Sequence, residues 1–379
     1  MATMADKRES SQESNFTPQL RSWIEDCEML HPKCKTRTRK PTFMPSRLLD
    51  LSPLLGDTGM VRLVVTTSIA KEQTSKRYLA LSYCWGDGGP SCKTTSTNLA
   101  SRLEGFLLSS LPSTHRDFIR IAQRLGVPYV WIDSLCILQD SSSDWKQESK
   151  SMGLIYSNAY FTVSALEPNN ASAGIFRVCL TTATEGSEAP EPSGSANKAD
   201  LSEWEERFRT AALNKRGWTV QERELSTRIV HFYQDEMFWE CRTAQATWSS
   251  PRLQLKTFLG QYFRILDSSS IHARGNLSVL ASWRKMVEDY TSRSLKVPGD
   301  RLHALSGIAS MVKEHLGCDY VSGLWAASIV DDLHWITTGP KPPYPEEGRA
   351  PSWSWAAFDC PIKFVTHGFA GSPYHTFMG

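Results

Sequence analysis

The stretch Phe118-Ile-Arg-Ile-Ala-Gln-Arg-Leu-Gly-Val-Pro-Tyr-Val-Trp-Ile-Asp133 decides the fold class of this chain. Its first half carries apolar residues at helical spacing, namely Phe118, Ile121, Ala122 and Leu125. Gly126 then supplies a helix stop, and the apolar run 127–132 predicts a buried strand. A helix that leads through a glycine into an apolar strand is half of a βαβ unit.

The neighbouring segments continue this alternation. A strand is predicted over 78–84, ahead of the opening stretch, and a helix over 142–158 and a strand over 160–166 follow it. Alternating strands and helices predict an α/β fold, with a mostly parallel sheet flanked by helices. The segment 181–200 is almost free of apolar residues, so we interpret it as a low-complexity insertion in this domain.

The rest of the chain changes character. A short helix is predicted over 218–225, and a hairpin follows, with strands at 228–233 and 237–241. Amphipathic patterns then predict a mainly helical C-terminal region, with helices over 276–291, 300–316 and 322–336.

Composition excludes several classes of protein. The 379 residues carry a net charge of +2, which argues against the basic stripe of a nucleic-acid-binding protein. Nine cysteines without framework spacing indicate reduced thiols inside the cell. The N-terminus lacks the apolar core of a signal peptide, and no apolar stretch is long enough for a membrane helix. We therefore expect a soluble, cytoplasmic protein that binds neither nucleic acid nor membrane.

Asp133 is the first candidate for a functional side chain. It closes the apolar strand, and ligands of open α/β sheets lie beyond the carboxyl ends of the strands. A carboxylate there can bind a ribose hydroxyl, orient a base or hold a cation. The structural alternative is that Asp133 caps the next turn or pairs with an arginine.

Glu222 is the second candidate. It follows Trp218 by four residues, so both side chains can share one helix face. A carboxylate beside a large aromatic ring is partly desolvated, which raises its pKa and suits acid–base or ion-pair work. The alternative is a surface glutamate paired with Arg216 or Arg223.

Ser82, Trp85 and Gly86 end the first strand, where backbone N–H groups could bind phosphate. The glycines that follow are too short a run for a Walker or Rossmann loop, and an ordinary exit from the strand is the alternative. Arg216 and Arg177 each stand beside a glycine-containing turn and could hold a phosphate or carboxylate, or form internal salt bridges.

The cysteines give weaker signals. Cys84 and Cys136 lie in apolar runs and carry no protease signature, so we interpret them as buried thiols. Cys27, His31 and Cys34 have metal-like spacing, but structural zinc needs four ligands and no nearby residue completes the set. Packing or solvent exposure is the favoured interpretation, so we assign no metal there, and a zinc site is the alternative.

Three motifs occur in a fixed order: Tyr78-Leu-Ala-Leu-Ser-Tyr-Cys-Trp-Gly86, Tyr129-Val-Trp-Ile-Asp-Ser-Leu-Cys-Ile137 and Arg216-Gly-Trp-Thr-Val-Gln-Glu222. Their wording and order closely resemble the fungal heterokaryon incompatibility (HET) domain family over roughly residues 78–240. The segment Pro351-Ser-Trp-Ser-Trp-Ala356 resembles one found downstream in many HET proteins. The resemblance implies a role in fungal non-self recognition that ends in programmed cell death.

A second, distant resemblance is to TIR domains. Trp218-Thr-Val-Gln-Glu222 is similar to their Trp-x-x-x-Glu helix, and Tyr78-Leu-Ala-Leu-Ser-Tyr83 is similar to their opening strand. This resemblance implies a TIR-like (flavodoxin-like) core in which Glu222 is the catalytic residue of an NAD glycohydrolase, with NAD as substrate and no cofactor. The implied substrate-binding residues are Ser82, Trp85, Gly86, Asp133, Arg216 and Trp218.

The alternative is a non-enzymatic signalling module that acts by self-association or by binding another incompatibility protein. The two mechanisms predict different geometry. An enzyme needs Glu222 to face an open cleft with Asp133 across it, whereas a glutamate buried against an arginine favours assembly.

The predicted organisation has four parts. A disordered N-terminus (1–18) precedes an extension (19–77) that packs on the core. The HET domain (78–241) and the mainly helical C-terminal region (242–379) follow.

Overall fold

The computed structural model describes residues 4–35, 43–56, 59–69, 77–87, 89, 92–176, 198–233, 236–255, 262, 268–339 and 348–365. Arg177 and residues 181–197 of the predicted insertion lie outside the described residues. The last three residues of that insertion, 198–200, are helical.

A ten-stranded mixed sheet organises the fold, in the order β10-β9-β8-β7-β6-β3-β5-β1-β2-β4. Its four central strands are parallel to one another. They are β3 (Tyr78–Ser82), β5 (Tyr129–Trp131), β6 (Phe161–Ala165) and β7 (Arg228–Tyr233). The outer strands are β1 (Arg47–Asp50), β2 (Met60–Val65), β4 (Phe106–Leu107), β8 (Glu236–Cys241), β9 (Ala244–Thr247) and β10 (Gln254–Leu255).

The prediction of a mostly parallel sheet is wrong, although the α/β class is confirmed. Parallel pairing is confined to the centre, and the strands added on both sides pair antiparallel. The physical reason is the length of the connections. β7 to β9 are joined by links too short to hold a crossover helix, and such links permit only antiparallel neighbours.

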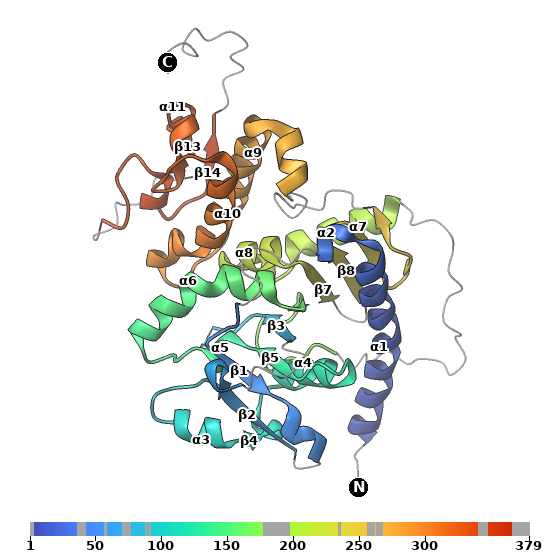
Figure 1. Cartoon of the computed structure of the whole chain (residues 1–379). Coiled ribbons are helices and arrows are strands. Elements are labelled where there is room, and N and C mark those ends of the chain that lie inside the picture. Colours follow the sequence, from blue (N-terminus) through green and yellow to red (C-terminus); the bar gives the residue numbers. More distant parts are fainter. Residues whose placement is uncertain are drawn as a thin grey trace.

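Helices cover both faces of the sheet (Figure 1). α6 and α8 contact each other, and α10 (Ser306–Leu316) of the C-terminal region contacts both, so α6 and α8 lie between the sheet and that region. α4 contacts α1. Among the described residues, none of the helices combines the length and apolar character that crossing a membrane requires. The helices of the sheet region are α1 (Met4–Leu30), α2 (Pro32–Lys35), α3 (Leu99–Glu104), α4 (Ser113–Arg124), α5 (Asp133–Cys136), α6 (Ser142–Asn158), α7 (Lys198–Thr210) and α8 (Trp218–Leu225).

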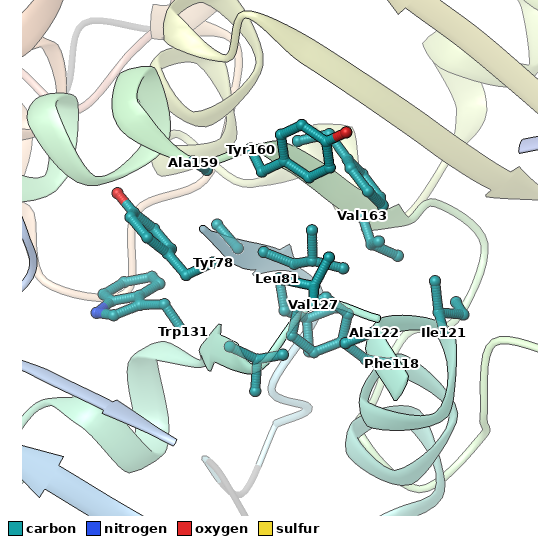
Figure 2. Close-up of a cluster of buried hydrophobic side chains, with 14 of the residues drawn as sticks. Tyr78, Leu81, Phe118, Ile121, Ala122, Val127, Trp131, Ala159, Tyr160 and Val163 are labelled. Atoms are coloured by element: carbon teal, nitrogen blue, oxygen red, sulfur yellow. The ribbon is translucent and has the colours of Figure 1, made fainter. Parts of the chain in front are cut away.

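The main core lies where β3, α4, β5 and β6 meet. Figure 2 shows Tyr78, Phe118, Trp131 and Val163 converging from these four elements, and each is buried. Gly126, with φ +70°, ends the run after α4, as the sequence predicts. Burial of such large side chains supplies the main driving force for this part of the fold.

The N-terminal segment differs from its prediction. α1 begins at Met4, within the stretch 1–18 that composition predicted to be disordered. Phe16 is buried, and its ring stacks on Phe176 at 5.7 Å between centroids. Further along α1, the Trp23 Nε1 donates to the Pro251 carbonyl (2.6 Å). Phe16 is therefore held by an aromatic residue far along the chain, a contact that local composition does not show.

The C-terminal region forms a second core. Its helices are α9 (Ser268–Thr291), α10 (Ser306–Leu316) and α11 (Ile329–Asp332), and its strands are β11 (Tyr320–Val321), β12 (Leu324–Trp325), β13 (Trp335–Thr337) and β14 (Ile362–Phe364). The predicted helix over 322–336 is wrong, because Gly323 adopts φ +101° and lies against the Trp355 ring. A Cβ there would stand 2.7 Å from the Trp355 Nε1, so the turn requires glycine.

Two glycines allow α6 and α10 to approach closely. A Cβ on Gly307 would lie 2.9 Å from the Cα of Gly153 and 2.7 Å from the Gln221 Oε1. The same Gln221 oxygen accepts a hydrogen bond from the Gly307 N–H (2.6 Å). This contact joins the C-terminal region to α8, which carries Glu222.

We predict that Gly307→Ala lowers the free energy of unfolding by about 1–3 kcal/mol, because the added methyl group overpacks the contact between α6 and α10. Chemical denaturation measures the change. Gly299→Ala is the matched control, since no atom lies within 4 Å of its added Cβ. Equal effects of the two substitutions would contradict the prediction.

Candidate functional site

The start of α8 is held by the C-terminal region. The Gly217 N–H donates to the Ser294 carbonyl (2.8 Å), and the Ser294 N–H donates to the Lys215 carbonyl (2.7 Å). A Cβ on Gly217 would lie 2.7 Å from Leu295, so a larger residue would push α8 away. These contacts fix the position from which the next turn of α8 presents Glu222 to the sheet.

Glu222 meets the end of strand β3. Its carboxylate accepts a hydrogen bond from the hydroxyl of Ser82, the last residue of that strand. The Glu222 side chain is buried, with 4% of its surface exposed. Burial raises the pKa of Glu222 to about 7, and the nearby charge of Asp133 adds to the rise. Arg216, Ser82 and Tyr156 act in the opposite direction.

Asp133 lies at the end of the neighbouring strand β5, where it begins α5. One carboxylate oxygen accepts from the Trp85 indole N–H (2.7 Å), and the other accepts from the Ser134 N–H (2.6 Å). Its enclosure by protein raises the pKa of Asp133, against the opposing effect of Arg216. The bond from the Ser134 N–H agrees with the alternative in which Asp133 caps the next turn. The bond from Trp85 joins the motif at 78–86 to the motif at 129–137.

Arg216 places a positive charge close enough to act on both acids. Its guanidinium donates to the carbonyl of Tyr83, one residue beyond β3. Its charge lowers the pKa of both Glu222 and Asp133. The three motifs therefore supply one polar cluster, defined here as Ser82, Asp133, Arg216 and Glu222.

Other predicted site residues lie outside the polar cluster. The Trp218 side chain donates to Asp300 (Nε1 to Oδ2, 3.2 Å) and packs edge-on against Trp145. Gly86 has φ +91° and lies so close to Asn170 that a Cβ would stand 2.9 Å from the Asn170 Cβ. The structure therefore gives Trp218 and Gly86 packing contacts, while Trp85 touches the cluster through Asp133.

The two cysteines in apolar runs are buried thiols. Burial raises the pKa of Cys84, and it raises the pKa of Cys136 to about 12. Two histidines of the sheet region have contacts of their own, since His115 packs edge-on against Tyr83 and His231 binds Glu240 (2.7 Å). A raised thiol pKa opposes nucleophilic catalysis.

Sequence reasoning missed Tyr156, which lies beside the polar cluster. Its hydroxyl donates to the Leu81 carbonyl (3.0 Å) and also lowers the pKa of Glu222. Met152, one turn earlier on the same helix, lies on its buried face. The same spacing of four could have placed Tyr156 on that face.

The fold supplies the fourth ligand that no residue near Cys27, His31 and Cys34 in the sequence provides. Cys241, at the end of β8, joins them, and all four residues are buried. The sequence could not show this, because Cys241 lies more than 200 residues after Cys34.

The arrangement combines two carboxyl groups and a guanidinium at the carboxyl edge of parallel strands. Near pH 7 Glu222 is about half ionised, so it can accept a proton or stabilise a positive charge. Glu222 does not face an open cleft. Its side chain is enclosed beside the positive charge of Arg216, which is the geometry that favours assembly over catalysis.

Comparison with known proteins finds a family model that covers the polar cluster. Residues 78–222 match the family model described as heterokaryon incompatibility protein (HET). A curated relative, heterokaryon incompatibility protein 6 (OR allele) of Neurospora crassa, is 30% identical over 128 residues, or 32% of this chain and 18% of that protein. No solved structure matches the chain.

Residues 78–222 of this chain therefore carry a HET domain, and a part of the chain is similar to a heterokaryon incompatibility protein. The matched segment begins at Tyr78 and ends at Glu222, so it contains every member of the polar cluster. The match leaves Cys27, His31, Cys34 and Cys241 outside the domain.

We predict that Glu222→Gln stabilises the protein more as pH rises. In the unfolded chain Glu222 ionises above about pH 4.5, whereas the folded carboxyl keeps its proton until about pH 7. The wild-type free energy of unfolding therefore falls across this window, and the variant lacks that loss. The difference between variant and wild type should grow by about 3 kcal/mol between pH 4 and 8. A constant difference in denaturant titrations at several pH values would refute it.

Proposed function

We propose that this protein acts in a fungal incompatibility response, and that its HET domain signals cell death by hydrolysing NAD at Glu222. The incompatibility role is supported by the family match over 78–222 and by the Neurospora crassa relative. We place this activity in the cytoplasm, under the control of self-association or of another incompatibility protein.

Strand order supports a TIR-like core. Numbered along the chain, the parallel strands β3, β5, β6 and β7 lie in the order 2-1-3-4. This is the beginning of the flavodoxin-like order, whose ligand crevice lies at the carboxyl ends of the first and third strands. In this chain those strands are β3 and β6, and Ser82 is the last residue of β3.

The observation that carries the proposal is the convergence of Ser82, Asp133 and Glu222 around Arg216. Burying carboxyl groups and an arginine costs desolvation energy that well-packed apolar residues would not incur. Carboxyl groups with a raised pKa beside a specific charge partner are candidates for a functional site. The pKa of Glu222, raised to about 7, fits a group that works near neutral pH.

The reaction needs few parts. The bond between the ribose C1′ and the nicotinamide nitrogen breaks, nicotinamide leaves with the bonding electrons, and positive charge develops on the ribose. Ionised Glu222 would stabilise this charge, as carboxylates do in glycosidases. Water then forms the new C1′–O bond and releases a proton, which gives ADP-ribose. Ser82 favours the ionised form of Glu222 by donating a hydrogen bond to it.

This chemistry requires the polar cluster to open, because 4% exposure leaves Glu222 no contact with a nucleotide. Trp85, half-buried, donates to Asp133 and borders the cluster. Withdrawal of Trp85 would uncover Asp133, and self-association or a partner is the event that we propose drives it.

The enclosure of Glu222 favours a second candidate, a non-enzymatic module that signals by assembly. In that role Ser82 and Arg216 hold Glu222 as part of the fold, and the surface of the domain carries the function. Glu222→Gln would then leave signalling intact.

We predict that yeast cells expressing the protein lose NAD and stop growing, and that Glu222→Gln abolishes both effects. Removing the charge that stabilises the ribosyl cation should slow hydrolysis about 100-fold or more. Cellular NAD and growth are measured together at matched protein abundance, and released nicotinamide is measured with purified protein.

Glu224→Gln is the matched control, because Glu224 is buried on the same helix and accepts a hydrogen bond from the Tyr262 N–H outside the polar cluster. NAD loss with wild type and this control, but not with Glu222→Gln, supports hydrolysis. Growth arrest by all three proteins with NAD intact would reject it in favour of assembly. No effect from any of them would contradict an activity carried by this chain alone.

A further inference from the structure

Four metal-ligating side chains converge at the junction between the N-terminal segment and the sheet. Cys27 lies on α1, His31 follows that helix, Cys34 lies on α2, and Cys241 ends strand β8. The sulfur and imidazole atoms that could bind a metal all lie within 4.8 Å of one another. These four residues are called the Cys3His cluster below.

Local hydrogen bonds shape the N-terminal half of the Cys3His cluster. The His31 N–H donates to the Cys27 carbonyl (3.2 Å), and the Cys34 N–H donates to the His31 carbonyl (3.0 Å). These turns direct three side chains of one short segment to the same side. Cys241 then completes the set from a distant part of the chain.

The donor set and its dimensions fit zinc. Tetrahedral zinc with bonds of 2.0–2.3 Å places its ligand atoms about 3.5–3.8 Å apart. The Cys241 Sγ lies 3.4 Å from the His31 Nδ1, close to that spacing. Three cysteines and one histidine form a known structural zinc set, and soft thiolate ligands disfavour magnesium and calcium.

The surroundings of the Cys3His cluster suit thiolates. The Cys241 Sγ accepts N–H groups from Thr243 (3.4 Å) and Ala244 (3.2 Å). The Cys27 Sγ accepts from the Arg228 Nε (3.2 Å), and Arg228 is buried. Outer contacts of this kind orient and stabilise metal ligands.

Charge balance agrees with the same ion. Three thiolates and a neutral imidazole around Zn²⁺ leave one net negative charge, which the Arg228 guanidinium offsets. Arg228 also donates to the Cys34 carbonyl (3.2 Å), so it contacts both α1, through Cys27, and α2, through Cys34. A buried arginine at this position has an electrostatic reason if the thiols are ionised.

We propose that Cys27, His31, Cys34 and Cys241 bind one structural zinc ion, which fastens the N-terminal segment to strand β8. Four protein ligands leave no open coordination position, so the ion is structural and not catalytic. The site is separate from the polar cluster and does not depend on the proposed hydrolysis of NAD.

The experiment measures metal and thiols in the purified full-length protein. Elemental analysis should give about one zinc per chain, and Cys241→Ser should lose it. Replacing the zinc by Co²⁺ should produce the visible absorption of tetrahedral cobalt and the near-ultraviolet charge-transfer band of cobalt thiolates. Cys136→Ala is the matched control, since Cys136 is equally buried outside the Cys3His cluster and should keep the zinc.

A second measurement covers the case in which Cys241→Ser fails to fold. A zinc chelator should lower the Tm of the wild-type protein by roughly 5 °C or more, and added Zn²⁺, but not Mg²⁺, should restore it. Folded wild-type protein without metal would overturn the proposal. A disulfide among Cys27, Cys34 and Cys241 in the protein purified from a reducing cytosol, or zinc retained in folded Cys241→Ser, would overturn it too.

Discussion

The pair of backbone hydrogen bonds that joins Lys215 and Gly217 to Ser294 is the constraint on which the rest of this arrangement depends. It fixes the first turn of α8 against the C-terminal region, and Trp218 adds its bond to Asp300. With that end held, the next turn can bring Glu222 only to the end of β3. The C-terminal region, outside the HET match, therefore positions a residue inside it.

The same constraint explains why the polar cluster is tolerated. α8 packs on both α6 and α10. Gly153 of α6 and Gly307 of α10 lie against each other and against side chains of α8. A helix held on both sides can present a carboxylate to a buried position, because apolar contacts around it offset the desolvation cost. The apolar contacts of the two surrounding cores thus offset the desolvation free energy of the polar cluster.

Periodicity predicted the central elements well. The bounds of α6 and α8 agree with the predicted 142–158 and 218–225, and β7 agrees with 228–233. These segments carry strong local patterns that agree with their final packing. The strand alternation did not reveal that β8 to β10 extend the sheet antiparallel, because strand direction depends on connections and not on residue pattern.

The candidate site was predictable only in part. Ser82 and Asp133 could be proposed because each ends an apolar strand. Glu222 could be proposed from its spacing to Trp218, and Arg216 from its place beside a glycine-containing turn. The sequence could not place Trp218 against Asp300, nor Cys241 beside Cys27, since these pairs depend on contacts between distant segments. The residue pattern also could not predict that Glu222 is enclosed, because its burial depends on side chains from several elements.

The bond between Trp23 and the Pro251 carbonyl has a consequence for how the chain is made. The two residues are 228 positions apart, and translation adds about 5–20 residues each second. The N-terminal helix is therefore synthesised about 10 to 45 seconds before the segments that cover its apolar side. During that time Phe16 and Trp23 lack their final partners, and we expect chaperones that recognise apolar segments to bind this helix.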